Sequence, residues 1–244
     1  MNKLIVKTNN KKYPIYVGND ILKDLRKILI NEKINFRKTL IMVDKKIKKK
    51  FIKQILINLK NKENYVIKFK STENNKNIGE VEKIINFLLS KNFSRHDCVI
   101  SVGGGILGDL SGFVSSIYKR GLKFINIPTT LLSQVDASIG GKTGVNQKKF
   151  GKNLIGSFYQ PELVLSDTEF LKTLNQKELI CGYGEILKHS LLQGTTNFNY
   201  LDKNFNNILS LKEPFLSNSI LYSCRIKKKV VEKDVNEKDT RKIL

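Results

Sequence analysis

A glycine-rich segment near the middle of the chain holds the first residues that could do chemistry. Residues 101–110 read SVGGGILGDL, with three consecutive glycines followed by Gly108 and Asp109. Glycine is costly to order, so it is kept where a larger residue would block a close approach. Between a strand and a helix, such a turn brings backbone N–H groups toward an anion such as a phosphate. G-G-G-x-x-G-D is not the usual dinucleotide fingerprint, so both cofactor binding and simple close packing stay open.

A second polar segment follows shortly after. Residues 129–146 read TTLLSQVDASIGGKTGVN and place Asp136, Lys142 and Asn146 in what we expect to be a loop, because the stretch is too polar and glycine-rich for a core. Its GGKTG resembles a P-loop, but a P-loop needs glycine at position 136, where this chain has Asp. ATP binding of that kind is therefore excluded, while the polar loop strengthens the cofactor interpretation of the glycine turn.

Alternating strand and helix patterns must position these segments. Apolar strands are expected at 3–8, 14–18, 39–44, 65–70, 97–102 and 123–127, and helical periods at 19–30, 45–60 and 78–92. Asn19 and Asp20 are the candidate caps of the first helix. This order predicts an α/β fold, with a Rossmann-like, doubly wound domain over residues 1–168. Only helical periods follow Glu169, so we expect a helical domain over residues 169–244.

The amino-acid composition indicates a globular chain with enough apolar residues to form a hydrophobic core. The 244 residues are 40% hydrophobic and 9% aromatic. Cys98, Cys181 and Cys224 have neither disulfide-like nor metal-like spacing, and we expect Cys98 and Cys181 to be small buried hydrophobes. The first residues lack the pattern of a signal peptide, and a run of about 18 apolar residues is absent from the sequence. We therefore expect a cytoplasmic protein without a membrane partner.

The net charge of +22 invites a nucleic-acid interpretation. The residue types argue against it, because only 6 of the 44 basic residues are Arg, the planar donor suited to phosphate recognition, and the lysines are scattered among asparagines. Clustered arginines and aromatic platforms are not visible in the sequence. We expect no nucleic-acid partner and attribute the charge to drift in composition at exposed positions.

Three segments together carry a family resemblance. The chain resembles the 3-dehydroquinate synthase family of sugar phosphate cyclases in GGGILGDLSGFVSSIYKRGLKFINIPTTLLSQVDASIGGKTGVN, GKNLIGSFYQPELVLSD and GYGEILKHSLL. The resemblance runs over residues 1–244. It implies an enzyme of the shikimate pathway that uses catalytic NAD and zinc or cobalt. The implied reaction converts 3-deoxy-D-arabino-heptulosonate 7-phosphate to 3-dehydroquinate with loss of phosphate. Transient oxidation of a hydroxyl acidifies the neighbouring C–H, which explains a redox cofactor in a reaction without net redox change.

The resemblance assigns a set of cofactor residues in several loops. A carboxylate at a strand end suits ribose hydroxyls, and a glycine backbone suits a pyrophosphate. For Glu73 and Lys76 the alternative is a solvated loop. The residues assigned to NAD are Asp44, Glu73, Lys76, Gly104, Gly105, Ile106, Leu107, Gly108, Asp109, Thr129, Thr130, Lys142, Lys152, Phe170, Leu171, Lys172 and Thr173.

The resemblance also implies a substrate shell rich in cations, because the substrate carries a carboxylate and a phosphate. Arg120 would reach the substrate phosphate from the neighbouring subunit, which implies a homodimer. The residues assigned to the shell are Asp136, Lys142, Lys152, Asn153, Lys188, Lys227, Arg241 and Arg120.

The implied metal site contains Glu185, which the family supplements with two histidines beyond the position of Arg241. The only histidines of this chain are His96 and His189. We expect His96 to lie at the surface, and we do not expect His189 to replace a lost ligand, although it shares a helix face with Glu185.

The second domain is therefore expected to be incomplete. We expect either a fragment of a longer enzyme or a shortened, decaying or repurposed product. For these 244 residues we expect negligible turnover even with added zinc, but retained NAD binding.

The alternatives are another sugar phosphate cyclase, a metal-dependent alcohol dehydrogenase of the same superfamily, and a non-catalytic NAD-binding remnant. Asn153 favours dehydroquinate synthase over other cyclases, and the segment 129–146 disfavours the dehydrogenase. The missing histidines favour the remnant.

Overall fold

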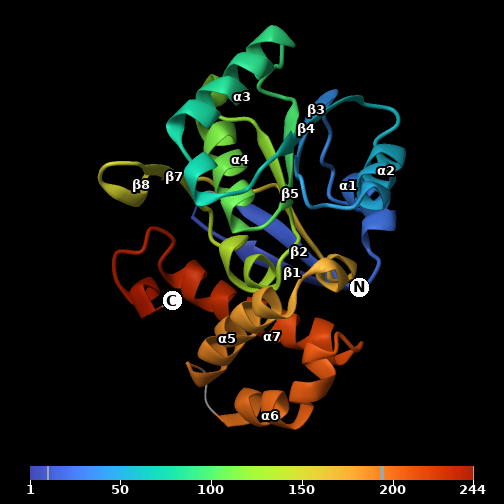
Figure 1. Cartoon of the computed structure of the whole chain (residues 1–244), viewed down its shortest axis with the longest axis vertical. Coiled ribbons are helices and arrows are strands. Elements are labelled where there is room, and N and C mark those ends of the chain that lie inside the picture. Colours follow the sequence, from blue (N-terminus) through green and yellow to red (C-terminus); the bar gives the residue numbers. More distant parts are fainter. Residues whose placement is uncertain (10, 193–194, 244) are drawn as a thin grey trace.

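A seven-stranded sheet runs through the computed structural model, which describes residues 1–9, 11–192 and 195–243 (Figure 1). In sheet order the strands are β1 (Asn2–Lys7), β2 (Lys12–Gly18), β9 (Leu163–Asp167), β6 (Lys123–Pro128), β5 (Cys98–Gly103), β3 (Lys38–Asp44) and β4 (Glu63–Phe69). β1 pairs antiparallel with β2, and every other neighbouring pair in this sheet is parallel. The predicted parallel sheet is confirmed.

Helices cover both faces of the parallel strands (Figure 1). On one face lie α1 (Leu25–Asn31) and α2 (Lys49–Asn58); on the other lie α3 (Ile78–Ser90) and α4 (Gly105–Ile117). Side chains alternate along β3, so Ile41 packs in the core with α1 and α2, while Leu40 packs in the core with α3 and α4. Burial on both faces explains why these strands are continuously apolar.

Three further helices gather at one end of the molecule (Figure 1). They are α5 (Gln176–Leu191), α6 (Thr195–Leu209) and α7 (Phe215–Lys233). Their apolar side chains share a core with β1 and β2, in which Val6 and Ile15 accompany Leu216 and Ile220. The domain boundary between residues 168 and 169 stays a prediction. Among the described residues, every helix is too short or too polar to cross a membrane.

Short helical turns link these elements. They are the 3-10 turns Leu22–Asp24, Glu73–Asn75, Tyr118–Arg120, Thr168–Thr173 and Thr240–Ile243, and the π-helical turn Ser133–Ala137.

A hairpin replaces the loop that the sequence led us to expect around Lys142. β7 (Lys142–Gln147) pairs antiparallel with β8 (Gly151–Phe158). The hairpin packs on α4 at Gly112, where an added Cβ would lie 2.4 Å from Thr143 Cγ2. The loop prediction was therefore wrong for residues 142–146, which lie in a mostly polar strand that pairs with β8 and packs on α4. At Gly112, glycine serves close packing.

The predicted capping of α1 was also wrong. The helix begins at Leu25 after a 3-10 turn, and neither Asn19 nor Asp20 caps it. Instead Asp167, at the end of β9, accepts the backbone N–H groups of Asp20 at 2.9 Å and Leu22 at 2.8 Å. A carboxylate distant in sequence thus satisfies the N–H groups that the local cap residues were expected to satisfy.

The cysteines are all unpaired, and two of them are buried as small hydrophobes. Cys98 lies inside β5 and Cys224 inside α7. Cys181 is exposed on α5, so its predicted burial was wrong. The α5 face that carries it points away from the core.

We predict that Asp167→Ala lowers the free energy of unfolding by about 2–4 kcal/mol, because a buried charged acceptor of several backbone hydrogen bonds is lost. Its Oδ1 also accepts from Glu169 N at 2.9 Å, and its residue is 1% exposed. Urea unfolding measures the change. The matched control is Asp24→Ala, whose carboxylate makes no capping hydrogen bond and should matter by less than about 0.5 kcal/mol. Equal losses in both variants would contradict the assignment.

Candidate functional site

The cofactor residues named from the sequence come together at one edge of the sheet. Strands β3, β5, β6 and β9 are parallel, so the segments that follow them meet at their carboxyl ends. Asp44 is the last residue of β3. Residues 104–109 follow β5, Thr129 and Thr130 follow β6, and the turn Thr168–Thr173 follows β9. Thr129 N donates to Gly103 O at 2.9 Å, which joins two of these segments.

The glycine turn forms the start of α4. Gly104 is the N-cap in an extended conformation, and it makes no side-chain capping bond. The first N–H groups of an α-helix lack partners within the helix, so those of residues 105–107 can face an anion. The Leu107 side chain is fully buried in the core, so only its backbone can contribute to a ligand site.

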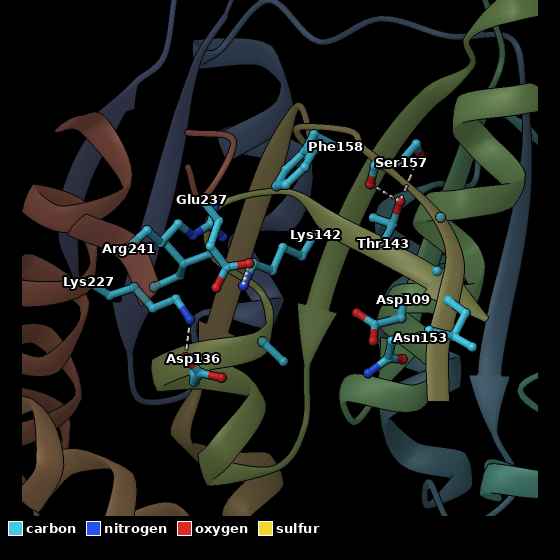
Figure 2. Close-up of a pocket in the computed structure, with 15 residues that line it drawn as sticks. Asp109, Asp136, Lys142, Thr143, Asn153, Ser157, Phe158, Lys227, Glu237 and Arg241 are labelled. Carbon is cyan, nitrogen blue, oxygen red and sulfur yellow. Dashed lines mark hydrogen bonds and ion pairs between the residues drawn. The ribbon is translucent and has the colours of Figure 1, made fainter. Parts of the chain in front are cut away.

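A polar cavity of about 570 Å³ lies beside the start of α4 (Figure 2). Its charged and polar wall includes Asp109, Asp136, Lys142, Asn153, Lys227 and Arg241. These residues come from α4, the π-helical turn, the β7–β8 hairpin, α7 and the turn near the end of the chain. The structure therefore brings six residues of the expected site to one cavity.

Carboxylates face the cations of this cavity. Lys227 points at Asp136 and forms an ion pair with it, and Lys142 forms an ion pair with Glu237 (Figure 2). Burial lowers the pKa of Lys227, while the carboxylate of Asp136 acts in the opposite direction. Lys142 is about half exposed, at 48% of its side-chain surface, so its ammonium remains accessible to a ligand.

Lys76 links the first turns of α4 to the β7–β8 hairpin. Its Nζ lies 2.5 Å from Asp109 Oδ2 and 2.5 Å from Asn153 Oδ1, and its side chain is 5% exposed. A solvated loop is therefore the wrong description of Lys76. Burial raises the pKa of Asp109 to about 6, and the Lys76 ammonium limits that rise. Asn146 completes the link, because its N–H donates to Lys76 O at 2.8 Å.

Glu185 and His189 lie side by side on α5, near Asp136. One donor atom from each of Asp136, Glu185 and His189 lies within 4.8 Å of the others. Lys188 Nζ lies 2.7 Å from Glu185 Oε1. Burial lowers the pKa of His189 to about 4, with a smaller contribution from Lys227, so its imidazole is neutral at pH 7. The group contains the donor types that bind divalent transition metals.

Arg241 forms part of the cavity wall from a buried position. Its Nη1 donates to Gly140 O at 3.0 Å and to Val235 O at 2.6 Å. Gly140 has φ +97°, and an added Cβ there would lie 2.2 Å from Arg241 Nη2. The glycine is therefore required both by the backbone conformation and by the close approach of the guanidinium.

Other expected site residues lie apart from the cavity. Arg120 is exposed beyond the C-terminal end of α4, and Lys152 is exposed with its Nζ 3.6 Å from Glu73 Oε1. In the turn after β9, Phe170 and Leu171 have buried side chains, so a ligand can reach only their backbone. Lys172 is paired with Glu169, and Thr173 Oγ1 donates to Phe170 O at 2.7 Å. The roles assigned to these residues stay predictions.

Two residues of the site were not anticipated from the sequence. Glu237 pairs with Lys142, and its only signal was a position four residues before Arg241. Gln134 is fully buried, and its amide donates to Pro128 O at 3.1 Å and to Asp167 O at 2.9 Å. It thereby joins the carboxyl ends of β6 and β9, and its polarity within an apolar stretch was the available signal.

Comparison with known proteins identifies relatives over the whole chain. Family models match residues 66–181 (3-dehydroquinate synthase N-terminal) and 182–244 (3-dehydroquinate synthase C-terminal). A 3-dehydroquinate synthase of Pelagibacter ubique is 55% identical over 242 residues, which are 99% of this chain and 66% of that protein. One from Alkaliphilus metalliredigens is 40% identical over 244 residues, which are 100% of this chain and 67% of that protein. The chain thus spans about two thirds of the length of these relatives.

Solved structures share the fold. A 2-deoxy-scyllo-inosose synthase complexed with carbaglucose-6-phosphate, NAD+ and Co2+ matches with a TM-score of 0.91 at 21% identity, over 99% of this chain and 65% of that one. A 2-epi-5-epi-valiolone synthase from Streptomyces hygroscopicus subsp. jinggangensis with NAD+ and Zn2+ matches with a TM-score of 0.84 at 24% identity, over 97% and 66%. At these identities the likeness establishes the fold.

We predict that Lys76→Met raises the pKa of Asp109 further above its value of about 6, because an opposite charge that favours the carboxylate is removed. Carboxyl-carbon NMR across a pH titration measures this pKa. The control is Lys83→Met, since Lys83 is exposed and pairs with Glu80 on α3. An unchanged pKa in the Lys76 variant would show that the buried contact does not act on Asp109.

Proposed function

Since this chain belongs to the 3-dehydroquinate synthase family, we propose that it forms the NAD-binding and substrate-binding part of a 3-dehydroquinate synthase. The reaction converts 3-deoxy-D-arabino-heptulosonate 7-phosphate to 3-dehydroquinate and phosphate, in the shikimate pathway. One observation carries the proposal: the cofactor segments at the sheet edge and the charged cavity lie next to each other, joined by the contact of Lys76 with Asp109 and Asn153.

The sheet edge fits a dinucleotide. The start of α4 offers unpaired N–H groups to a pyrophosphate, and Asp44 offers a carboxylate to ribose hydroxyls. Its Oδ1 accepts from Lys46 N at 2.8 Å, which holds the carboxylate at the end of β3. When bound there, NAD would supply reversible hydride transfer.

The cavity fits an acid that carries a phosphate. Lys142, Lys227 and Arg241 provide cations on its wall, and the accessible ammonium of Lys142 is suited to a phosphate or carboxylate. The Lys227–Asp136 pair places a proton donor and a proton acceptor on the same wall. Asn153 adds an amide from the hairpin, oriented by Lys76.

A divalent metal, zinc or cobalt, belongs to the same proposal. Glu185 would supply one ligand, and its carboxylate lies beside Asp136 and His189 in a group of donors that suits such an ion. A cation held there would act as a Lewis acid toward a substrate oxygen.

A non-catalytic NAD-binding remnant is the second candidate. The chain has two histidines, and His96 lies just before β5, at the amino edge of the sheet and opposite the site. It is therefore too far away to join Glu185. The remnant predicts binding of NAD without release of phosphate. Another sugar phosphate cyclase would release phosphate from a different sugar phosphate and yield a different carbocycle.

A homodimer and a cytoplasmic location complete the proposal. Arg120 is exposed and away from the cavity of its own chain, as expected of a residue that serves a neighbouring subunit. The three unpaired cysteines suit a reducing compartment.

We predict that the chain binds NAD+ and that Asp44→Ala weakens this binding by about tenfold or more, because a charge-assisted hydrogen bond contributes about 1.5–3 kcal/mol. Calorimetry measures the affinity. Asp202→Ala, an exposed carboxylate on α6, is the control and should leave the affinity unchanged. A folded chain that does not bind NAD+ would contradict both candidate functions.

We predict that Lys142→Ala weakens binding of the heptulosonate phosphate by about tenfold or more in the presence of NAD+, because a charge-assisted contact with an anionic group is lost. Calorimetry again gives the affinity, and Lys148→Ala on the same hairpin turn is the matched control. Phosphate release by these 244 residues with NAD+ and Co2+ added would contradict the remnant, whereas the negligible turnover expected above is shared by a partial cyclase and a remnant. Full substrate affinity in the Lys142 variant would contradict its role.

A further inference from the structure

The pair Glu185 and His189 has unsatisfied atoms that face each other. Glu185 Oε1 and His189 Nε2 are 3.2 Å apart, and both are buried atoms without a hydrogen-bond partner of good geometry among the described residues. Lys188 Nζ forms an ion pair with the same Oε1 at 2.7 Å. An unpartnered Nε2 in a buried ring is costly, so a small rotation that lets it bond to Glu185 Oε1 is favoured.

The other ring nitrogen of His189 already has a partner. Nδ1 lies 2.5 Å from Ser223 Oγ on α7. A neutral imidazole carries one proton, and the other nitrogen is then an acceptor. If Nδ1 held the proton, the lone pair of Nε2 would face the Glu185 carboxylate, which is unfavourable. If Nε2 holds the proton, Nδ1 accepts from the Ser223 hydroxyl and Nε2 donates to Glu185, so both contacts are satisfied.

We propose that His189 is the positioning residue of Glu185: its Nε2–H donates to the Glu185 carboxylate, and its Nδ1 accepts the hydroxyl proton of Ser223. The side chain of His189 is fully buried, so this contact holds one orientation of the carboxylate on α5 relative to α7. Glu185 Oε1 is then occupied by His189 and Lys188, which leaves Oε2 for a cation near Asp136.

Only the part of this inference that concerns the cation rests on the proposed function. The tautomer of His189 and its contact with Glu185 are properties of the chain itself. A metal held directly by Nε2 is the competing arrangement, and it requires the opposite tautomer, with the proton on Nδ1.

The first test is the tautomer of His189. Long-range 1H–15N NMR of the metal-free chain at pH 7, labelled at histidine, resolves two rings because the sequence contains two histidines. The variant His96→Gln identifies the His189 signals. We expect one neutral tautomer with the proton on Nε2, and a mixture of tautomers in Glu185→Ala. A proton on Nδ1 of the unmodified chain overturns the proposal.

The second test measures the affinity for Co2+ by visible absorption. His189→Gln keeps an N–H donor near the position of Nε2 and should bind Co2+ within about threefold of the unmodified chain, whereas His189→Leu should lose about 10–100-fold. His96→Leu is the control, and circular dichroism verifies folding. Equal losses of Co2+ affinity in both His189 variants would identify His189 as a metal ligand. Unchanged Co2+ affinity in both variants would identify His189 as a purely structural residue. Either result overturns the proposal. A chain that does not bind Co2+ contradicts the proposed metal, while the NMR result still decides the contact.

Discussion

The ion pair between Lys227 and Asp136 is the contact on which the shape of the cavity depends. Lys227 belongs to α7 and Asp136 to the π-helical turn after β6, so the pair joins the helical end of the chain to the parallel sheet. Cys224, one turn earlier on α7, lies against the same turn with its Sγ 3.4 Å from Gln134 O. Gln134 in turn ties the ends of β6 and β9 together. Moving α7 would therefore displace the cavity wall at Asp136 and disturb the turn that Gln134 anchors to β6 and β9.

The charges of the site are organised in pairs. Lys76 pairs with Asp109, Lys142 with Glu237, and Lys188 with Glu185. Removing an ion from water costs several kcal/mol, so a partly buried cation needs a carboxylate while the ligand is absent. Under the proposed function, an anionic ligand would share or replace these carboxylates. For this reason the net charge of +22 is uninformative about function, whereas the individual pairs are informative.

Much of the sheet could be predicted because its strands are buried on both faces and read as continuous apolar runs. The β7–β8 hairpin could not, since Lys142–Gln147 is mostly polar and forms a strand by pairing with β8 and packing closely on α4 at Gly112. The residues of the candidate site likewise fall into those that local sequence pattern reveals and those that it does not. The glycine turn and its position after a strand follow from local pattern, but the burial of Lys76 and the contact of Glu237 with Lys142 join residues far apart in sequence.

The two ends of the site depend on different parts of the fold. The cofactor edge is built from segments that follow parallel strands, and the core beneath it is formed by the sheet with α1 to α4. The Glu185 end is built from α5 and α7, and it depends on the separate core that these helices share with β1 and β2. Because Ser223 and Lys227 lie one turn apart on α7, the same helix orients His189 and neutralises Asp136. A perturbation in that core therefore reaches the Glu185 end and the cavity wall together, while the start of α4 keeps its own support.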